Sequence, residues 1–279
     1  MDRDEQRRAA LESWETMASG WERRRADIES ITAPVTEWLI EALEPRPGET
    51  ILELAAGPGD TGFAASASLG EEGRLISTDF SPEMVEVGQR RAAELGLTNV
   101  EHRLMDAERL DLEDGSVDGA LCRFGFMLMV DPAAALAETQ RVLRPGGRLA
   151  LAVWRGADRN PWVSLAGRML TEQGLVPPPE PDAPGMFVMA SDDRMRELLE
   201  GAGLTAERLE DVPVRFVYEG VDDYVESARD TGGMFARAWG GATKDDRQAI
   251  TAELAELFAP FGVDGGYVFP GLAFCALAR

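Results

Sequence analysis

The sequence predicts an α/β protein built on a doubly wound, mostly parallel sheet with a helical lid. Two observations support this fold class. Between residues 48 and 155, strand-like apolar runs alternate with helical segments, which is typical of a parallel sheet covered on both faces. A glycine-rich loop, GPGDTG (57–62), directly follows the first apolar run, at the edge where sheets of this kind bind ligands.

Two amphipathic helices are expected before the first strand. Residues 8–21 repeat apolar side chains at steps of three and four, which is one face of a helix. A second helix is expected to run to about residue 44, where a stretch rich in proline and glycine ends it. Trp14 and Trp21 share one face of the first helix, and we expect residues 1–47 to form part of the lid.

Residues 48–155 are expected to form the ligand-binding core, with five strands and three helices. The strands are expected at 50–56, 74–79, 100–106, 117–124 and 148–154, and the helices at 61–69, 81–96 and 131–144. In the second of these helices, Ser81 suits the N-cap and Gly96 suits the C-terminal stop. The sequence Pro145-Gly146-Gly147 is expected to end the third helix as a turn.

Beyond residue 155 the pattern is looser. Residues 156–279 are expected to complete the sheet and to carry lid insertions at about 156–190 and 221–262. Helices are expected at 161–173, 191–203, 221–237 and 244–260, and strands at 207–218 and 266–279. Residues 177–185 are too rich in proline for either structure, so we expect a surface connection there.

The composition argues against several classes of function. The net charge is −22, and such a field repels nucleic-acid backbones, so no nucleic-acid partner is expected. No apolar stretch approaches the roughly 20 residues of a membrane span. The charged start of the chain argues against a secretory signal, so a cytoplasmic protein is expected. His102 is the only histidine and Cys122 and Cys275 are the only cysteines, so no metal site is expected.

The glycine loop and Asp79 together predict a site for a cofactor that carries a ribose. Glycines at the carboxyl edge of the first strand let the backbone approach a ligand closely. Asp79 ends the second strand, 17 residues beyond Gly62, where its carboxylate can accept hydrogen bonds from both ribose hydroxyls. NAD(P) and S-adenosylmethionine both carry a ribose, so these residues leave both cofactors open.

Two further carboxylates favour S-adenosylmethionine. Glu53 lies four residues before Gly57, where it would repel the pyrophosphate of a dinucleotide but attract an ammonium and a sulfonium. Asp106 ends the third strand, where its carboxylate can accept a hydrogen bond from an adenine amino group. The first strand also begins about 50 residues into the chain, whereas dinucleotide-binding domains more often begin with their first strand.

The core resembles the class I S-adenosylmethionine-dependent methyltransferases, and it is similar to the branch that includes the ubiquinone/menaquinone-biosynthesis methyltransferases. The segments that carry the resemblance are ILELAAGPGDTG (51–62), STDFSPEMVEVGQRRA (77–92), RLMDAERL (103–110), DGSVDGALCRFGFMLMVDPAAALAE (114–138) and RVLRPGGRLALAVW (141–154). The resemblance implies a Rossmann-like sheet of seven strands whose last strand is antiparallel, and S-adenosylmethionine as the cofactor.

The resemblance also implies which residues hold the methyl donor. The glycines would pack on its methionine part, the acidic strand ends would bind its ammonium, ribose and adenine, and two apolar side chains would flank the adenine. The end of the fourth strand would face the methionine part and the incoming nucleophile. The expected donor-binding residues are Glu53, Gly57, Gly59, Asp79, Phe80, Met84, Asp106, Ala107, Cys122 and Arg123.

The acceptor is expected to be a small apolar or aromatic molecule, because aromatic and methionine side chains gather at the strand ends and in the lid. The expected pocket residues are Trp14, Trp21, Phe126, Met127, Trp154, Phe235 and Trp239. Methyl transfer is an in-line displacement promoted mainly by positioning, and the sequence identifies no catalytic residue. An NAD(P)-dependent oxidoreductase and a non-catalytic S-adenosylmethionine-binding domain remain alternatives, and the oligomeric state is open.

Overall fold

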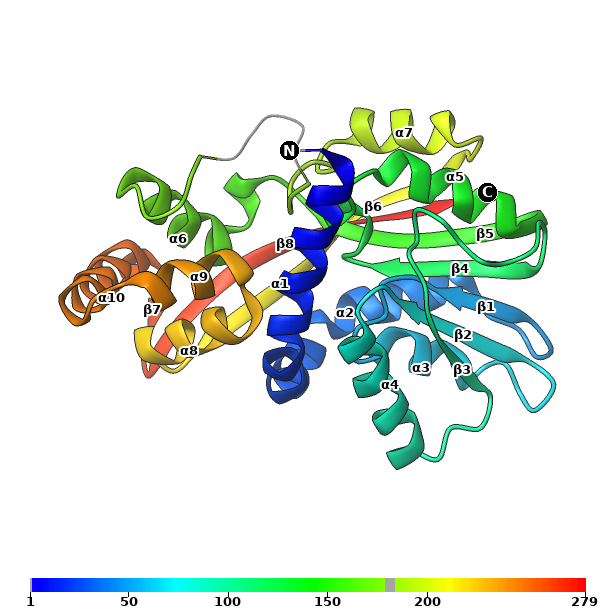
Figure 1. The fold of residues 1–279 in the computed structure, drawn as a ribbon, viewed down its shortest axis with the longest axis horizontal. Helices are drawn as coiled ribbons and strands as arrows, with labels where there is room; N and C mark the ends of the chain where they lie inside the picture. The colour runs from blue at the N-terminus through cyan, green and yellow to red at the C-terminus, as the bar shows by residue number, and fades with distance from the viewer. Residues whose placement is uncertain (1, 179–183) are drawn as a thin grey trace.

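The computed structural model of the protein describes residues 2–178 and 184–279 (Figure 1). These residues form one mixed sheet with helices on both faces, and two long strands carry a smaller lobe away from one end of it. The proline-rich connection expected at 177–185 falls mostly outside the described residues.

The strand order of the sheet is β3-β2-β1-β4-β5-β8-β6. The strands are β1 (Thr50–Glu53), β2 (Arg74–Asp79), β3 (Val100–Leu104), β4 (Val117–Arg123), β5 (Leu143–Trp154), β6 (Ala206–Tyr218) and β8 (Gly266–Ala278). The first five run parallel, and β8 runs antiparallel to both β5 and β6. This confirms the expected sheet, to which the two-residue strand β7 (Gly262–Val263) is an addition.

Helices cover both faces of the sheet and thereby bury its parallel strands. The helices α2 (Arg25–Leu43), α3 (Asp60–Ser66) and α4 (Pro82–Glu94) lie on one face, and α5 (Pro132–Val142) and α7 (Asp192–Gly201) lie on the other (Figure 1). Side-chain caps fix three helix starts, because Ser81, Asp131 and Ser191 each accept a backbone amide three residues further on. A strand buried on both faces needs consecutive apolar residues, and Ile51 and Leu52 of β1 are fully buried.

Two elements differ from the expectation at glycine-containing stretches. The turn expected at Pro145-Gly146-Gly147 is built into the start of β5, where the pairing of β5 with β4 shifts its register. The helix expected at 221–237 is two helices, α8 (Val221–Thr231) and α9 (Gly233–Gly241), which meet at Gly232. Gly232 leaves the helical conformation, with φ −111° and ψ 93°, and a Cβ there would lie only 2.8 Å from the Ala228 carbonyl oxygen, which favours glycine at this junction.

The distal lobe (residues 213–272) is built on the parts of β6 and β8 that extend beyond β5. β8 pairs with β5 only through its residues 273–278, whereas its pairing with β6 continues to Tyr267. Figure 1 shows α8, α9 and α10 (Lys244–Phe258) packed around this two-stranded extension. Edge-to-face aromatic contacts fill the lobe, with Tyr224 and Phe269 each against the ring of Phe258.

Helix α1 (Arg3–Arg23) lies between the core and the distal lobe (Figure 1). It packs against α4 on the core side and against α8 and α9 on the lobe side. Near its N-terminus, Arg3 pairs with Asp131 at 2.5 Å and Arg7 pairs with Glu108, both on the core. Near its C-terminus, Gly20 lies directly against the backbone of Asp230 at the end of α8. A single helix therefore bridges the two parts of the molecule.

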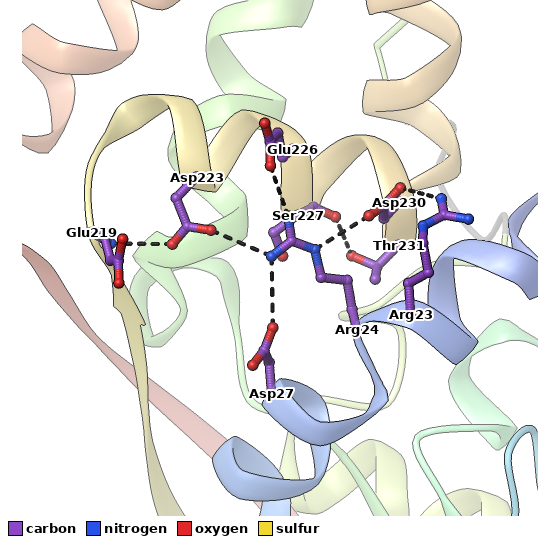
Figure 2. Close-up of polar contacts among 9 residues, drawn as sticks. All are labelled: Arg23, Arg24, Asp27, Glu219, Asp223, Glu226, Ser227, Asp230 and Thr231. Atoms are coloured by element: carbon purple, nitrogen blue, oxygen red, sulfur yellow. Dashed lines mark hydrogen bonds and ion pairs between the residues drawn. The ribbon is translucent and has the colours of Figure 1, made fainter.

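An ionic cluster fastens the C-terminal end of α1 to α8, and Figure 2 shows its residues. The Arg24 guanidinium lies within 3.2–3.6 Å of four carboxylates, those of Asp27, Asp223, Glu226 and Asp230. Two of these carboxylates are largely exposed to solvent, and exposed ion pairs each contribute little. The tight backbone contact at Gly20 is therefore expected to contribute more to this junction than the charges do.

We expect Gly20→Ala to destabilise the protein by about 1–3 kcal/mol, because the new methyl group would overlap the Asp230 carbonyl oxygen. Gly240→Ala is the matched control, since a Cβ at this position of α9 meets nothing within 4 Å. The control should leave stability unchanged or raise it by up to about 1 kcal/mol. Urea unfolding measures both, and equal effects of the two variants would contradict the close approach of α1 to α8.

Candidate functional site

A large cavity opens at the carboxyl ends of the parallel strands, and residues of the core, of α1 and of the distal lobe line it. Its volume is about 3030 Å³, whereas single-ligand pockets commonly measure roughly 300–1,000 Å³. The cavity therefore has room for two ligands side by side. Ligands bind at this edge of doubly wound sheets because the strand ends and the helix N-termini both face it.

The glycine loop is open toward the cavity. Ala55, Gly57 and Gly59 all adopt left-handed backbone conformations, with φ of 50°, 53° and 88°. A Cβ at Gly57 would meet nothing within 4 Å, so the cavity side of the backbone is uncovered there. The Gly57 amide donates a hydrogen bond of 2.9 Å to the Asp79 carboxylate, which fixes the loop to the end of β2.

The Asp79 carboxylate is held in one orientation at the tip of β2. One of its oxygens accepts the Gly57 amide and the other accepts the Ser81 amide at 3.0 Å. Burial raises the pKa of Asp79, and these backbone hydrogen bonds oppose that rise. Since each carboxylate oxygen has a second lone pair, Asp79 can still accept two hydrogen bonds from a ligand in the cavity.

Glu53 is buried and its two oxygens already have protein partners. One accepts the Gly62 amide at 2.7 Å and the other accepts the Ser77 hydroxyl at 3.1 Å. Gly62 must be a glycine, because a Cβ there would overlap the Glu53 carboxylate. Burial raises the pKa of Glu53 to about 7, although the Gly62 and Ser77 hydrogen bonds and the charge of Arg123 lower it. Glu53 therefore ties β1 to α3 and also lines the cavity.

Asp106 follows β3 and faces the cavity beside Ala107. One Asp106 oxygen accepts the Glu108 amide at 2.9 Å, which leaves the other oxygen for a ligand. That second oxygen lies 3.7 Å from the Arg7 Nε atom of α1. Helix α1 thus reaches the part of the cavity that Asp106 lines.

An aromatic ladder lines the side of the cavity beyond β4 and consists of Phe124, Trp154, Trp162 and Phe216. The rings of Phe124 and Trp154 are stacked at 4.1 Å, and those of Trp162 and Phe216 at 3.8 Å. Trp154 and Trp162 meet edge to face at 5.3 Å. Phe124 has φ 62°, a strained conformation of the kind that gathers at ligand-binding positions.

The structure brings most of the predicted site residues to this one cavity. Those that line it are Glu53, Gly57, Asp79, Phe80, Met84, Asp106, Ala107, Arg123, Trp14, Trp21, Met127, Trp154 and Phe235. Their contacts with a ligand stay predictions. Sequence reasoning did not select Phe124 or Phe216, although Phe124 directly follows Arg123 and its position at a strand end was a usable signal.

Two residues predicted at the end of β4 lie outside the cavity lining, namely Cys122 and Phe126. Successive strand residues point to opposite faces, so Cys122 turns into the core while Arg123 faces the cavity. Burial raises the pKa of the Cys122 thiol to about 12, and the thiol therefore stays protonated at neutral pH. Phe126 is fully buried in the core.

Gly59 and Trp239 also lie outside the cavity lining. The ring of Phe63 covers Gly59, since a Cβ there would fall within 2.9 Å of three of its ring atoms. Trp239 stacks on Phe235, which does line the cavity, at 5.9 Å within the distal lobe, and the Arg247 guanidinium lies 5.6 Å from the centre of the Trp239 ring. Trp239 is therefore adjacent to a lining residue without being one itself.

The described ranges, 2–178 and 184–279, contain no group of three or more His, Cys, Asp or Glu side chains that could hold a metal ion. No helix within these ranges is both long enough and apolar enough to cross a membrane.

Residues 35–155 match a family model described as the ubiE/COQ5 methyltransferase family. The chain is 48% identical over 114 residues to an uncharacterized 37.1 kDa protein in transposon TN4556 of Streptomyces fradiae. The matched segment is 40% of this chain and 32% of that protein. The chain is 40% identical over 129 residues to the demethylmenaquinone methyltransferase of Beutenbergia cavernae, over 46% of this chain and 50% of that enzyme. The matches thus span half or less of these relatives.

The fold extends further than these sequence matches. A solved structure of a Bacillus halodurans C-125 protein superposes with a TM-score of 0.62 at 19% identity, over 88% of this chain and 97% of that chain. At this identity the likeness shows the fold alone. It nevertheless includes segments beyond residues 35–155, because it covers most of the chain.

We expect Glu53→Gln to remove a pH dependence of stability. The folded pKa of about 7 lies above the ordinary value of 4.5, so the carboxyl's contribution is fully present below pH 4.5 and is lost as the pH rises through 7. Relative to the variant, the wild type should lose about 2–3 kcal/mol between pH 4.5 and pH 8. Denaturant unfolding across this range measures the difference, with the exposed Glu71→Gln as control. A difference between wild type and Glu53→Gln that stays constant with pH would contradict the expectation.

Proposed function

We propose that this chain, whose residues 35–155 match the ubiE/COQ5 methyltransferase family, is a class I S-adenosylmethionine-dependent methyltransferase that transfers a methyl group to a small apolar or aromatic molecule. The observation that carries the proposal is the shared cavity. The Gly57 backbone, Asp79 and Asp106 line one end of it and the aromatic ladder lines another part. The relatives' methyltransferase names favour this activity over a dinucleotide-dependent oxidoreductase.

The residues at the strand ends fit the donor's nucleoside. Asp79 is a preoriented carboxylate with free lone pairs, which suits the two ribose hydroxyls. Asp106 has one oxygen free for the adenine amino group, and the Ala107 amide would reach a ring nitrogen. Phe80 and Met84 line the cavity and would flank the adenine ring. When bound, S-adenosylmethionine supplies a methyl group activated by its sulfonium.

Glu53 suits the positively charged end of the donor through its charge more than through direct contact. Both of its oxygens already accept protein hydrogen bonds, from Gly62 and Ser77. With a pKa of about 7, the side chain is close to half ionised at neutral pH. A donor ammonium nearby would favour the ionised form, so donor binding and ionisation of Glu53 support each other.

The acceptor is expected to lie along the aromatic ladder. Stacked rings offer planar apolar surface to a flat acceptor, and Phe124 places the ladder directly after Arg123 at the tip of β4. Tyr218 and Tyr224 also line the cavity, and burial raises the pKa of both hydroxyls. They therefore serve as hydrogen-bond donors rather than as bases, and rate enhancement rests on alignment and exclusion of water.

The net charge of the chain supports a small molecule rather than a nucleic acid as acceptor. The chain carries a net charge of −22, which repels phosphate backbones. The Beutenbergia cavernae relative is named as a demethylmenaquinone methyltransferase, and a quinone-like aromatic ring is one acceptor that would stack on the ladder.

We expect Asp79→Asn to weaken binding of S-adenosylhomocysteine by about 10- to 100-fold, because a charged acceptor of ribose hydrogen bonds becomes a neutral amide. Isothermal titration calorimetry measures this affinity, and circular dichroism checks that the variant folds. Asp111→Asn, an exposed site outside the cavity lining, is the control and should bind like the wild type. Unchanged affinity in Asp79→Asn would count against the donor assignment.

A further inference from the structure

A charged side chain in the cavity has no counter-charge in contact. Arg123 ends β4, its guanidinium lines the cavity, and one of its N–H groups is donated to the Thr32 hydroxyl of α2. Among the residues that the structure describes, Arg123 forms no ion pair within 4.0 Å. A guanidinium presents five N–H donors in a planar fork, so most of its donors remain available to a ligand.

Two carboxylates whose charges act on Arg123 already have other partners in the protein. Asp60 lies 2.7 Å from Arg91 and 3.7 Å from Arg25, and Glu53 accepts two protein hydrogen bonds. Burial lowers the pKa of Arg123, and the charges of Asp60, Glu53 and Glu29 partly restore it. These acids stabilise the cation from a distance, but none of them accepts a hydrogen bond from it. Arg123 is half-buried, and removing a cation from water without giving it a partner is costly.

The hydroxyl of Thr61, another polar group that lines the cavity, is also without a partner among the described residues. Thr61 is 2% exposed and lines the cavity, and its hydroxyl makes no hydrogen bond within the part of the chain described. Buried hydroxyls are normally paired. Thr61 precedes Gly62, whose amide holds Glu53, and the charge of Glu53 acts on Arg123. The unsatisfied hydroxyl and the unpaired guanidinium therefore both line the cavity in the region of Glu53.

We propose that Arg123, supported by Thr61, forms a carboxylate-binding site, and that the α-carboxylate of the methyl donor fills it. The proposal rests on the proposed function. The fork of Arg123 matches the two oxygens of a carboxylate. Two of the three acids that act on Arg123, Asp60 and Glu53, belong to the glycine-loop side of the cavity, which favours the amino-acid end of the donor over a carboxylate on the acceptor. Glu53, in the same region, then suits the adjacent ammonium.

A pair of probes that differ by one carboxylate tests the proposal. S-adenosylhomocysteine carries the α-carboxylate, and S-adenosyl-3-thiopropylamine is the same molecule without it. We expect wild type to bind the first probe at least about tenfold more tightly. Arg123→Met should reduce this preference to within about threefold, and Arg123→Lys should retain part of it. Arg159→Met, an exposed arginine on the same cavity, is the control and should keep the full preference.

A second arm separates the two sources of a carboxylate. Protein saturated with S-adenosylhomocysteine is titrated with 4-hydroxybenzoate and with 4-hydroxybenzyl alcohol, which differ in the carboxylate. A preference that Arg123→Met abolishes only in this arm would assign the site to the acceptor and overturn the donor assignment. Absence of any Arg123-dependent preference in both arms would overturn the carboxylate site itself.

The outcomes separate this inference from the proposed function. Failure of wild type to bind either nucleoside probe would refute the donor and, with it, the site. Tight binding of both probes without preference would refute only the site. Where Arg123→Met does not fold, as judged by circular dichroism, Arg123→Lys and the isosteric Thr61→Val decide, and an unchanged preference in both of them overturns the proposal.

Discussion

Two buried carboxylates hold the glycine loop open, and the geometry of the whole cavity follows from them. Asp79, at the tip of β2, accepts the Gly57 amide, and Glu53, at the tip of β1, accepts the Gly62 amide. These bonds fix both ends of a loop whose left-handed residues would otherwise be unfavourable. The two acids that the sequence marks as ligand contacts are thus also the framework that presents the bare backbone to a ligand.

Local sequence patterns were sufficient to predict the core sheet but not the aromatic side chains that line the cavity. Alternating strands and helices, with a cap such as Ser81, predicted the parallel sheet and placed Asp79 and Asp106 on one edge, because parallel strands end together. The pairing of rings in the aromatic ladder could not be read in this way, since Phe124, directly after β4, and Phe216, in β6, are 92 residues apart in the sequence. Nor does a sequence tell which of Cys122 and Arg123 turns inward, because a one-residue shift exchanges them.

Different segments of the chain build different parts of the cavity. The end of the cavity proposed to bind the methyl donor is built mainly from residues 35–155, which is the segment that matches the methyltransferase family model. The remaining walls come from α1 and from β6, β8 and the helices of the distal lobe. Under the proposed function, donor binding and acceptor choice would therefore depend on different parts of the sequence.

Helix α1 covers both ends of the cavity, and ion pairs fasten it to its surroundings. Arg7 joins it to the loop that carries Asp106, and Arg24 joins it to three acids of α8. Surface charge pairs weaken as dissolved ions screen them, whereas apolar contacts do not. The share of this helix's attachment that rests on charge therefore falls as salinity rises, whereas the share that rests on the close packing of Gly20 against Asp230 persists in brine.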